Sequence, residues 1–192
     1  MGLAVRVSHV RVSDEDLIAA ISNGDLQALG ALFDRHEPEV RRYVGRLGIR
    51  PSDADDVVQA TFLEVLSAAP RFDPTRSARS WLMGVATMMA RRHRQSVTRA
   101  LARIATWMSR SIGAEASPPT PAEVFALDET TRRLMRALDA MSPKKREVFA
   151  LVVLEELSGE EVARALGIPV NTVWTRLHHA RLELRAALGG ER

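Results

Sequence analysis

The sequence predicts an all-α fold of two small helical domains joined by a flexible linker. Nearly every segment spaces its apolar residues three or four positions apart, as amphipathic helices do, and none alternates convincingly like a strand. The segment 109–124 is rich in Gly, Ser and Pro and has no apolar period, which is typical of a linker. With 192 residues, the chain is long enough for one or two compact domains of roughly 100 residues each. We therefore expect a tail at 1–12, a first domain at 13–108, this linker, and a second domain at 125–188.

Local signals place two helices at the start of the first domain. Ser13 occupies a helix-capping position, and Asn23 with Gly24 supplies a stop for the first helix. A longer second helix follows and ends at Gly48, while Pro38 inside it is expected to kink or split it. The apolar stripe that marks this second helix consists of Leu26, Leu29, Phe33, Val40, Val44 and Leu47.

Two further helices complete the first domain. Ser52 and Asp55 have the spacing of a capping pair, which predicts that the third helix begins there. Its inward-facing residues should be Val58, Phe62, Val65 and Leu66. A loop spanning Pro70–Arg79 then leads to a fourth helix that starts near Trp81. We assign Phe72 and Trp81 to packing, with base stacking as the alternative.

The second domain opens with two helices and ends in a longer motif. Ser142 followed by Pro143 is a start signal between the first two helices. Their apolar positions are Leu134, Leu138, Met141, Val148, Leu151 and Val152. The motif that follows, LSGEEVARALGIPVNTVWTRLHHARLELR at 157–185, consists of a short amphipathic helix, a turn and a longer helix. Its pattern predicts a DNA-binding helix-turn-helix.

Four features of this motif agree with one another. Ser158 and Glu161 form a capping box, Ala163 is small enough for closely crossing helices, and Gly167 supplies a left-handed residue at the turn. The buried stripe of the second helix should be Val173, Leu177, Ala180 and Leu184. The alternative is a helical hairpin whose polar face is merely solvated. The agreement of cap, small residue, turn and stripe favours DNA binding.

The stripe turns the opposite face of this recognition helix toward a major groove. Side chains on or beside that face can reach base edges. They are Asn171, Thr172, Trp174, Thr175, Arg176, His178 and His179. Trp174 has two interpretations at this stage: it contacts a thymine methyl or the sugar, or it leans inward and covers the core.

Charge is unevenly distributed along the chain, although its formal net charge is only +3. The segment 71–110 holds nine arginines against the single Asp73. An acidic group precedes it, formed by Asp53, Asp55, Asp56 and Glu64. A solvated surface would tolerate this separation, but a helix-turn-helix in the same chain favours one face for phosphate and another for a basic protein.

Other chemistries lack support in the sequence. The absence of Cys removes disulfides and thiolate metal sites and fits a reducing cytoplasm, and no signal peptide or membrane-spanning segment is visible. His178 and His179 point about 100° apart on a helix and cannot chelate a metal together. No phosphate-binding glycine loop or nucleophile pattern occurs. We therefore expect a cytoplasmic protein with no catalytic site, no metal, no cofactor and no membrane insertion.

The order of motifs resembles a known family. DADDVVQATFLEV is followed by RFDPTRSARSWLMGVA and then by LDAMSPKKREVFALVVLEELSGEEVARALGIPVNTVWTRLHHAR. From about Asp14 to Arg185 the chain resembles extracytoplasmic-function sigma factors of the primary-sigma superfamily. The resemblance implies that the chain binds core RNA polymerase and promoter DNA. It implies that the first domain (region 2) contacts polymerase and the −10 element and the second (region 4) contacts the −35 element. A cognate anti-sigma factor is a further candidate partner on family habit alone.

The resemblance also assigns residues to these surfaces. Asp55, Asp56 and Gln59 lie within about one turn of a helix and should contact polymerase, although helix-dipole complementation accounts for Asp53 and part of Asp55. The −10 surface should comprise Arg71, Arg76, Arg79, Met88, Arg91, Arg92 and Arg94. Met88 and Arg92 stand where the family often has Asn and Asp, and Trp174 and His179 replace common basic residues. The preferred promoter sequence therefore does not follow from the family.

Two other functions remain open from the sequence. A stand-alone helix-turn-helix repressor or activator would bind promoter DNA by itself as a dimer. An all-α enzyme would need a convergent polar pocket in the first domain. Promoter-dependent transcription with core polymerase would separate these functions from a sigma factor.

Overall fold

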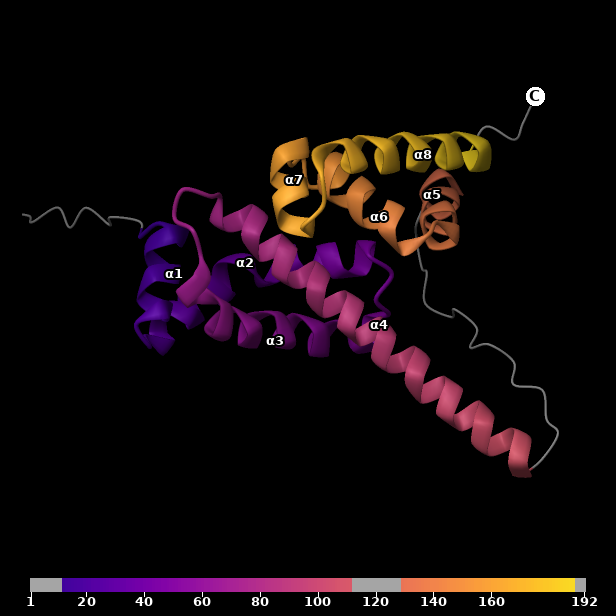
Figure 1. Ribbon diagram of the computed structural model, residues 1–192, viewed down its shortest axis with the longest axis horizontal. Helices are drawn as coiled ribbons and strands as arrows, with labels where there is room; N and C mark the ends of the chain where they lie inside the picture. Colours follow the sequence, from indigo (N-terminus) through magenta and orange to yellow (C-terminus); the bar gives the residue numbers. More distant parts are fainter. Residues whose placement is uncertain (1–11, 112–128, 189–192) are drawn as a thin grey trace, which may run out of the picture.

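The regular elements of the protein are helical wherever the structure describes it. In the computed structural model, residues 12–111 and 129–188 are described, and they fold into two helical bundles (Figure 1). This arrangement confirms the all-α prediction. Within the same two ranges, no helix is both long and apolar enough to cross a membrane. Residues 112–128 of the expected linker and residues 1–11 of the expected tail lie outside the described residues, so the proposed domain limits stay predictions.

The N-terminal bundle consists of α1 (Asp14–Ser22), α2 (Leu26–Arg46), α3 (Pro51–Ala68), the 3-10 turn η1 (Ala69–Arg71) and α4 (Ala78–Ser111). The predicted cap of α1 is present, because the Ser13 hydroxyl accepts the Asp16 N–H at 3.1 Å. Gly24 and Gly48 follow α1 and α2 with φ of +90° and +83°, which glycine adopts without strain. Asp25 caps α2 by accepting two backbone N–H groups, a role that the sequence analysis missed.

Two local predictions about α2 and α3 need correction. Helix α2 runs through Pro38 without splitting. Both Pro38 and Asp34, whose carbonyl loses its helical partner, are exposed, so water can satisfy that carbonyl. Helix α3 begins at Pro51, one residue before Ser52, and has no side-chain cap. The fixed φ of proline suits the first helical position, and this signal outweighs the capping pair.

Helix α4 starts earlier and extends further than expected. The Ser77 hydroxyl accepts the Ser80 N–H at 3.2 Å, and the helix begins at Ala78 rather than near Trp81. The loop is therefore shorter than predicted, and Arg79 lies in the first helical turn. The helix continues for 34 residues, past the domain limit expected at 108.

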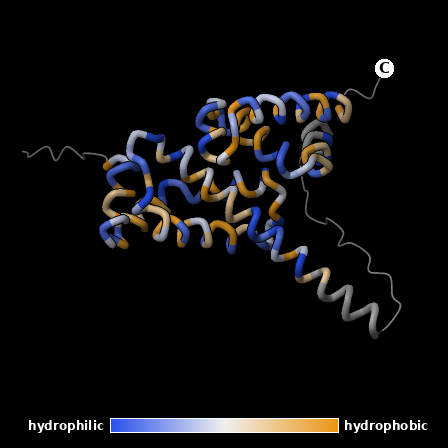
Figure 2. The backbone as a smooth tube through the Cα atoms, viewed as in Figure 1, coloured by the Kyte–Doolittle hydropathy of each residue, from blue (hydrophilic) through white to orange (hydrophobic). Residues whose placement is uncertain are grey.

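The core of the N-terminal bundle forms where α1, α2 and α3 pack around the first half of α4. Figure 2 shows apolar residues concentrated where the helices face one another. Tyr43 is fully buried in this core, and its hydroxyl lies 2.6 Å from the Thr87 hydroxyl. Thr87 already donates to the Met83 carbonyl at 2.8 Å, so Tyr43 is the donor in this pair. Burial raises the pKa of Tyr43, so its hydroxyl stays protonated.

The C-terminal bundle contains α5 (Glu129–Ala140), α6 (Pro143–Phe149), the π-helical turn η2 (Ala150–Leu154), α7 (Gly159–Leu166) and α8 (Val170–Leu188). The predicted start of α6 is confirmed, since Ser142 is its N-cap and Pro143 its first residue. The described members of the predicted apolar set are buried or half-buried. The side chain of Leu134 lies outside the described residues.

The helix-turn-helix forms as its local signals predict. Ser158 and Glu161 make both bonds of a capping box at the start of α7. Gly167 ends α7 with φ +64° and ψ +41°, the left-handed conformation. Helices α7 and α8 then pack together, and α7 also packs against α4 of the N-terminal bundle (Figure 1).

The Tyr43–Thr87 bond yields a stability prediction. Replacing Tyr43 with Phe keeps the ring but removes the donor, leaving a buried Thr87 oxygen one hydrogen bond short. We expect the free energy of unfolding to fall by about 1 kcal/mol. Urea denaturation followed by circular dichroism measures the change. An unchanged midpoint would show that the hydroxyl pair contributes nothing.

The capping box yields a pH-dependent prediction. Hydrogen bonds from the Ser158 N–H and hydroxyl lower the pKa of Glu161. A pKa lowered by folding stabilises the protein above the unfolded value, and this contribution is lost as pH falls through the folded pKa. Glu161→Gln should therefore cost roughly 0.5–1 kcal/mol at pH 7. Urea unfolding from pH 7 to pH 3 should show this difference shrink, and a constant gap would contradict the assignment.

Candidate functional site

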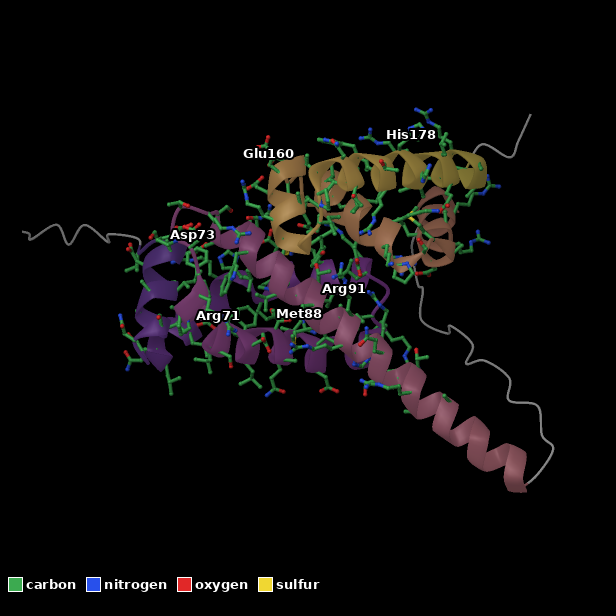
Figure 3. All side chains as sticks on the ribbon, in the orientation of Figure 1. Arg71, Asp73, Met88, Arg91, Glu160 and His178 are labelled. Carbon is green, nitrogen blue, oxygen red and sulfur yellow. The ribbon has the colours of Figure 1, made fainter. Side chains whose placement is uncertain are left out.

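Helix α8 presents one buried face and one open face. Val173, Leu177, Ala180 and Leu184 are its buried residues, as the apolar stripe predicts. On the opposite side, Asn171, Thr175 and His178 are exposed, and Figure 3 shows His178 on the outer side of the C-terminal bundle. Thr172 and Arg176 flank this face and are half-buried. The structure therefore brings the predicted −35 residues onto one accessible surface.

Trp174 is partly packed and partly open to solvent. It is 49% exposed, which leaves room for a ligand. Its ring also lies over Gly159, where an added Cβ would come within 2.4 Å of the Trp174 Cζ2. Gly159 is thus required by the close approach of the ring. Trp174 packs one surface against the start of α7 and offers the rest to solvent.

The hydroxyl and imidazole groups on α8 are differently placed. The Thr175 hydroxyl donates to the Asn171 carbonyl at 2.9 Å, which leaves its oxygen lone pairs as acceptors. His178 and His179 are both exposed, with ring centroids 5.8 Å apart. These groups offer donors and acceptors for base edges or phosphates.

Asp53 and Asp55 of α3 both bind other side chains of the N-terminal bundle. Asp53 is structural: it is bonded to Arg50, Ser52 and His93, and these bonds outweigh desolvation and lower its pKa. Asp55 forms an ion pair with Arg41, which also binds Glu37. The other two predicted polymerase contacts are Asp56 and Gln59.

Asp56 and Gln59 are both exposed. Among the residues that the structure describes, none forms a hydrogen bond or ion pair with the Asp56 side chain, so its carboxylate is available to a partner. Gln59 lies at the edge of an open apolar groove of about 270 Å³ between α2 and α3. The other residues that line this groove are Leu26, Leu29, Gly30, Phe33, Phe62 and Leu63.

The groove is apolar and uncovered. Leu26, Leu63 and Phe33 are exposed to 67%, 57% and 37% respectively. Phe33 packs edge-on against Phe62, with ring centroids 4.9 Å apart, so the floor of the groove is built. Leu26 and Phe33 belong to the apolar stripe predicted for this helix, and their role in an open surface was not predicted. Two large apolar residues two turns apart, with Gly30 between them, were the available signal.

The loop that precedes α4 has a defined shape. Asp73 accepts the Thr75 N–H at 3.0 Å and its hydroxyl at 2.7 Å, and these bonds lower the pKa of Asp73. Phe72 and Trp81 are half-buried with ring centroids 5.0 Å apart, in agreement with packing. Arg71, labelled in Figure 3, is exposed, and Arg76 is half-buried, so neither side chain is fully enclosed by the protein.

The arginines of α4 do not share one environment. Arg92 is exposed and pairs with Glu64 at 3.0 Å, a surface contact of small energetic value. Arg79, Arg91 and Arg94 instead form ion pairs that involve Glu147 or Glu155 of the C-terminal bundle.

The contacts with the C-terminal bundle divide the predicted −10 surface. Hydrogen bonding to the Glu147 carboxylate raises the pKa of Arg91. Met88, three residues before Arg91 on the same side of α4, is half-buried. The structure therefore separates the predicted −10 set into an open part, Arg71, Arg76 and Arg92, and a covered part, Arg79, Met88, Arg91 and Arg94.

The roles of Glu147, Glu155 and Arg46 in these ion pairs were not predicted from the sequence. Glu147 directly precedes the buried Val148 and Phe149, and its own side chain is buried. An acidic residue next to a run of core positions was the signal that a cation from another element should meet it.

Comparison with known proteins identifies the family of the chain. Residues 32–111 match the model of sigma-70 region 2, and residues 131–184 match that of sigma-70 region 4. The RNA polymerase sigma factor CarQ of Myxococcus xanthus is 31% identical over 87% of this chain and 92% of its own length. The RNA polymerase sigma factor CnrH of Cupriavidus metallidurans is 30% identical over 93% of this chain and 96% of its own.

A solved structure shows the same fold. CnrH in complex with the cytosolic domain of CnrY superposes with a TM-score of 0.64 at 28% identity, covering 93% of this chain and 99% of that one. Both family regions occur here in the order of the motifs, over the two bundles that the structure describes. The chain belongs to the sigma-70 family, as an RNA polymerase sigma factor of the extracytoplasmic-function group that directs promoter-specific transcription initiation.

Proposed function

We propose that this sigma factor binds the clamp of core RNA polymerase through the groove between α2 and α3. The observation that carries the proposal is the uncovered apolar groove, which Gln59 helps to line, with the exposed Asp56 three residues before Gln59 on α3. A contiguous apolar patch of this kind on a small domain marks an interaction surface. Its partner should combine apolar side chains, which fill the groove, with basic side chains that meet Asp56.

The promoter contacts are divided between the two bundles. The outer face of α8 contacts the −35 element, because its accessible residues have the donors, acceptors and apolar atoms that base edges require. Arg71, Arg76 and Arg92 contact the phosphates around the −10 element in the conformation described. The covered residues Arg79, Met88, Arg91 and Arg94 join them when the C-terminal bundle moves away.

Several finer properties belong to the same proposal. The protein acts in the cytoplasm, where polymerase and promoter DNA are, and it has no catalytic site of its own. An anti-sigma factor is a further partner; the solved structure of the relative CnrH, with the cytosolic domain of CnrY, supports this. A stand-alone regulator would show tight, dimeric promoter binding without polymerase.

The clamp proposal predicts the effect of two substitutions. Asp56→Arg places a like charge opposite a basic partner, and Leu63→Asp places a charge in the groove. Each should weaken binding of core RNA polymerase at least about tenfold, or about 1.4 kcal/mol. Fluorescence anisotropy of the labelled protein titrated with core polymerase measures this, and promoter-dependent transcription should fall in parallel.

Glu160→Arg is the matched control, because it makes the same charge reversal at an exposed residue of α7, away from the groove. It should bind polymerase like the unmodified protein. Thermal melting verifies that each variant is folded. Unchanged affinity in folded Asp56→Arg and Leu63→Asp variants would refute the groove as the clamp site.

The α8 proposal predicts a change of −35 preference. Trp174 offers one N–H and a large apolar surface, which suits a thymine methyl or sugar, whereas Arg donates two parallel bonds to guanine. Trp174→Arg should therefore shift a randomised −35 library toward guanine when holoenzyme-bound DNA is selected and sequenced. Some stability is lost because the ring leaves Gly159.

Ala186→Arg controls for added charge, since it lies about 18 Å further along the α8 axis. It should raise DNA affinity without changing base preference. If Trp174→Arg lowered the melting temperature strongly and left the selected sequences unchanged, Trp174 would be structural only.

A further inference from the structure

Glu147 of the C-terminal bundle is buried against arginines of the N-terminal bundle. Its side chain is 2% exposed. Arg91 donates to both carboxylate oxygens, from Nε at 3.0 Å and from Nη2 at 2.7 Å. Arg94 adds a bond at 2.8 Å and donates a second one to the carbonyl of Leu47, the residue that follows α2. All of the partners that the structure gives the Glu147 carboxylate belong to the other bundle.

Glu155 repeats this arrangement at the other side of the interface. Its side chain is 5% exposed and binds Arg46 at 2.5 Å and Arg79 at 3.1 Å. Arg79 also donates to the Glu155 backbone carbonyl at 2.9 Å, and Arg46 to that of Leu154 at 3.2 Å. The next residue, Glu156, has φ +56°, a left-handed conformation unusual for a non-glycine residue. The backbone is held in a turn that directs Glu155 toward the N-terminal bundle.

The backbones of the two bundles also approach closely. A Cβ added to Gly84 of α4 would lie 2.9 Å from the carbonyl oxygen of Ala165 in α7. A Cβ added to Gly48 would lie 1.9 Å from the Arg146 guanidinium. Gly84, Met88 and Arg91 lie one helical turn apart on α4, so one stripe of this helix faces the C-terminal bundle.

This closed arrangement is incompatible with simultaneous binding of both promoter elements. The −10 and −35 elements lie about 25 base pairs apart, or about 85 Å at about 3.4 Å per pair. Helices α4 and α7 are in contact, and the covered stripe includes the residues assigned to the −10 element. The chain between Ser111 and Glu129 is long enough to span about 60 Å when extended, so the covalent connection permits separation.

We propose that Glu147 and Glu155 form a latch that closes the free protein on itself and blocks its −10 surface. The two carboxylates occupy the guanidinium groups that DNA phosphates would otherwise bind. Promoter binding therefore requires the C-terminal bundle to leave α4. The closed state itself is independent of the function proposed above; its inhibitory effect rests on the assignment of α4 to the −10 element.

A distance measurement tests the latch in the full-length protein. The chain has no native Cys, so Ser67→Cys in α3 and Ala186→Cys in α8, both exposed, place spin labels at two sites only. Pulsed electron resonance should give one short, narrow distance distribution for the free protein. The Glu147→Gln/Glu155→Gln variant should shift it to longer, broader distances, because uncharged amides cannot hold four arginines.

Two controls and a second variant keep the test decisive. Glu183→Gln removes a carboxylate that pairs with Lys145 inside the C-terminal bundle, so it should leave the distribution unchanged. Gly84→Leu places a side chain against Ala165 and should open the molecule without touching either glutamate. Gly45→Leu is its control, since nothing lies within 4 Å of a Cβ at Gly45. Circular dichroism confirms helix content in each variant.

DNA binding tests whether the latch is inhibitory. The probe is a mixed-sequence single-stranded 12-mer. The double glutamine variant and Gly84→Leu should bind it about tenfold more tightly than the unmodified protein, with the salt slope steeper by roughly 0.7 per released arginine. Glu183→Gln should increase the affinity for this probe much less than the Glu147→Gln/Glu155→Gln variant does. Opened variants that bind no better than their controls would overturn the inhibitory role.

The outcomes also separate the latch from the clamp. A distribution unchanged in both the glutamine variant and Gly84→Leu would overturn the closed state, whether or not holoenzyme forms. A clear opening in those variants, combined with no binding of core polymerase by the unmodified protein, would leave the latch standing and refute the clamp proposal. Adding core polymerase and promoter DNA to the labelled, otherwise unmodified protein should lengthen the distances, and unchanged distances in the promoter-bound holoenzyme would overturn the requirement for opening.

Discussion

The pairing of two buried carboxylates with four guanidinium groups determines how the two bundles meet. Removing a carboxylate from water costs several kcal/mol unless charged hydrogen bonds replace the solvent. Glu147 and Glu155 find those bonds across the interface, which fixes its register to the positions of the arginines. Since desolvation offsets most of the Coulombic gain, such pairs give an interface specificity more than strength. An interface of this kind is well defined and still able to open.

The parts of the fold that local chemistry determines were predictable from the sequence. The capping box, the left-handed Gly167 and the buried stripe of α8 each depend on residues within one or two turns of one another. Competition between two local signals was harder to judge. At the start of α3, Pro51 prevailed over Ser52 and Asp55, and in α2 an exposed Pro38 was accommodated without a break.

The interface was not predictable from local patterns, for a chemical reason. A guanidinium group binds a carboxylate and a phosphate with the same planar pair of N–H donors. Arg91 and Arg94 therefore have identical sequence signals whether they meet DNA or Glu147. The groove between α2 and α3 was not predicted, for a related reason. Apolar periodicity predicts that Leu26 and Phe33 lie on a face that packs against another surface. It does not show whether that surface belongs to the same chain or to a partner.

The surfaces left open in the closed state constrain how it can be opened. The groove and the outer face of α8 are accessible, whereas the stripe of α4 is covered. A ligand shifts a two-state equilibrium only by its difference in affinity for the two states. Polymerase binding at the groove alone, equally accessible in both states, leaves the latch equilibrium unchanged. Opening requires a contact that the closed form cannot make, either phosphates at the arginines of α4 or a second polymerase site that holds the C-terminal bundle at a distance. Release of the −10 surface therefore depends on a contact outside the groove, made either with DNA at α4 or with the C-terminal bundle.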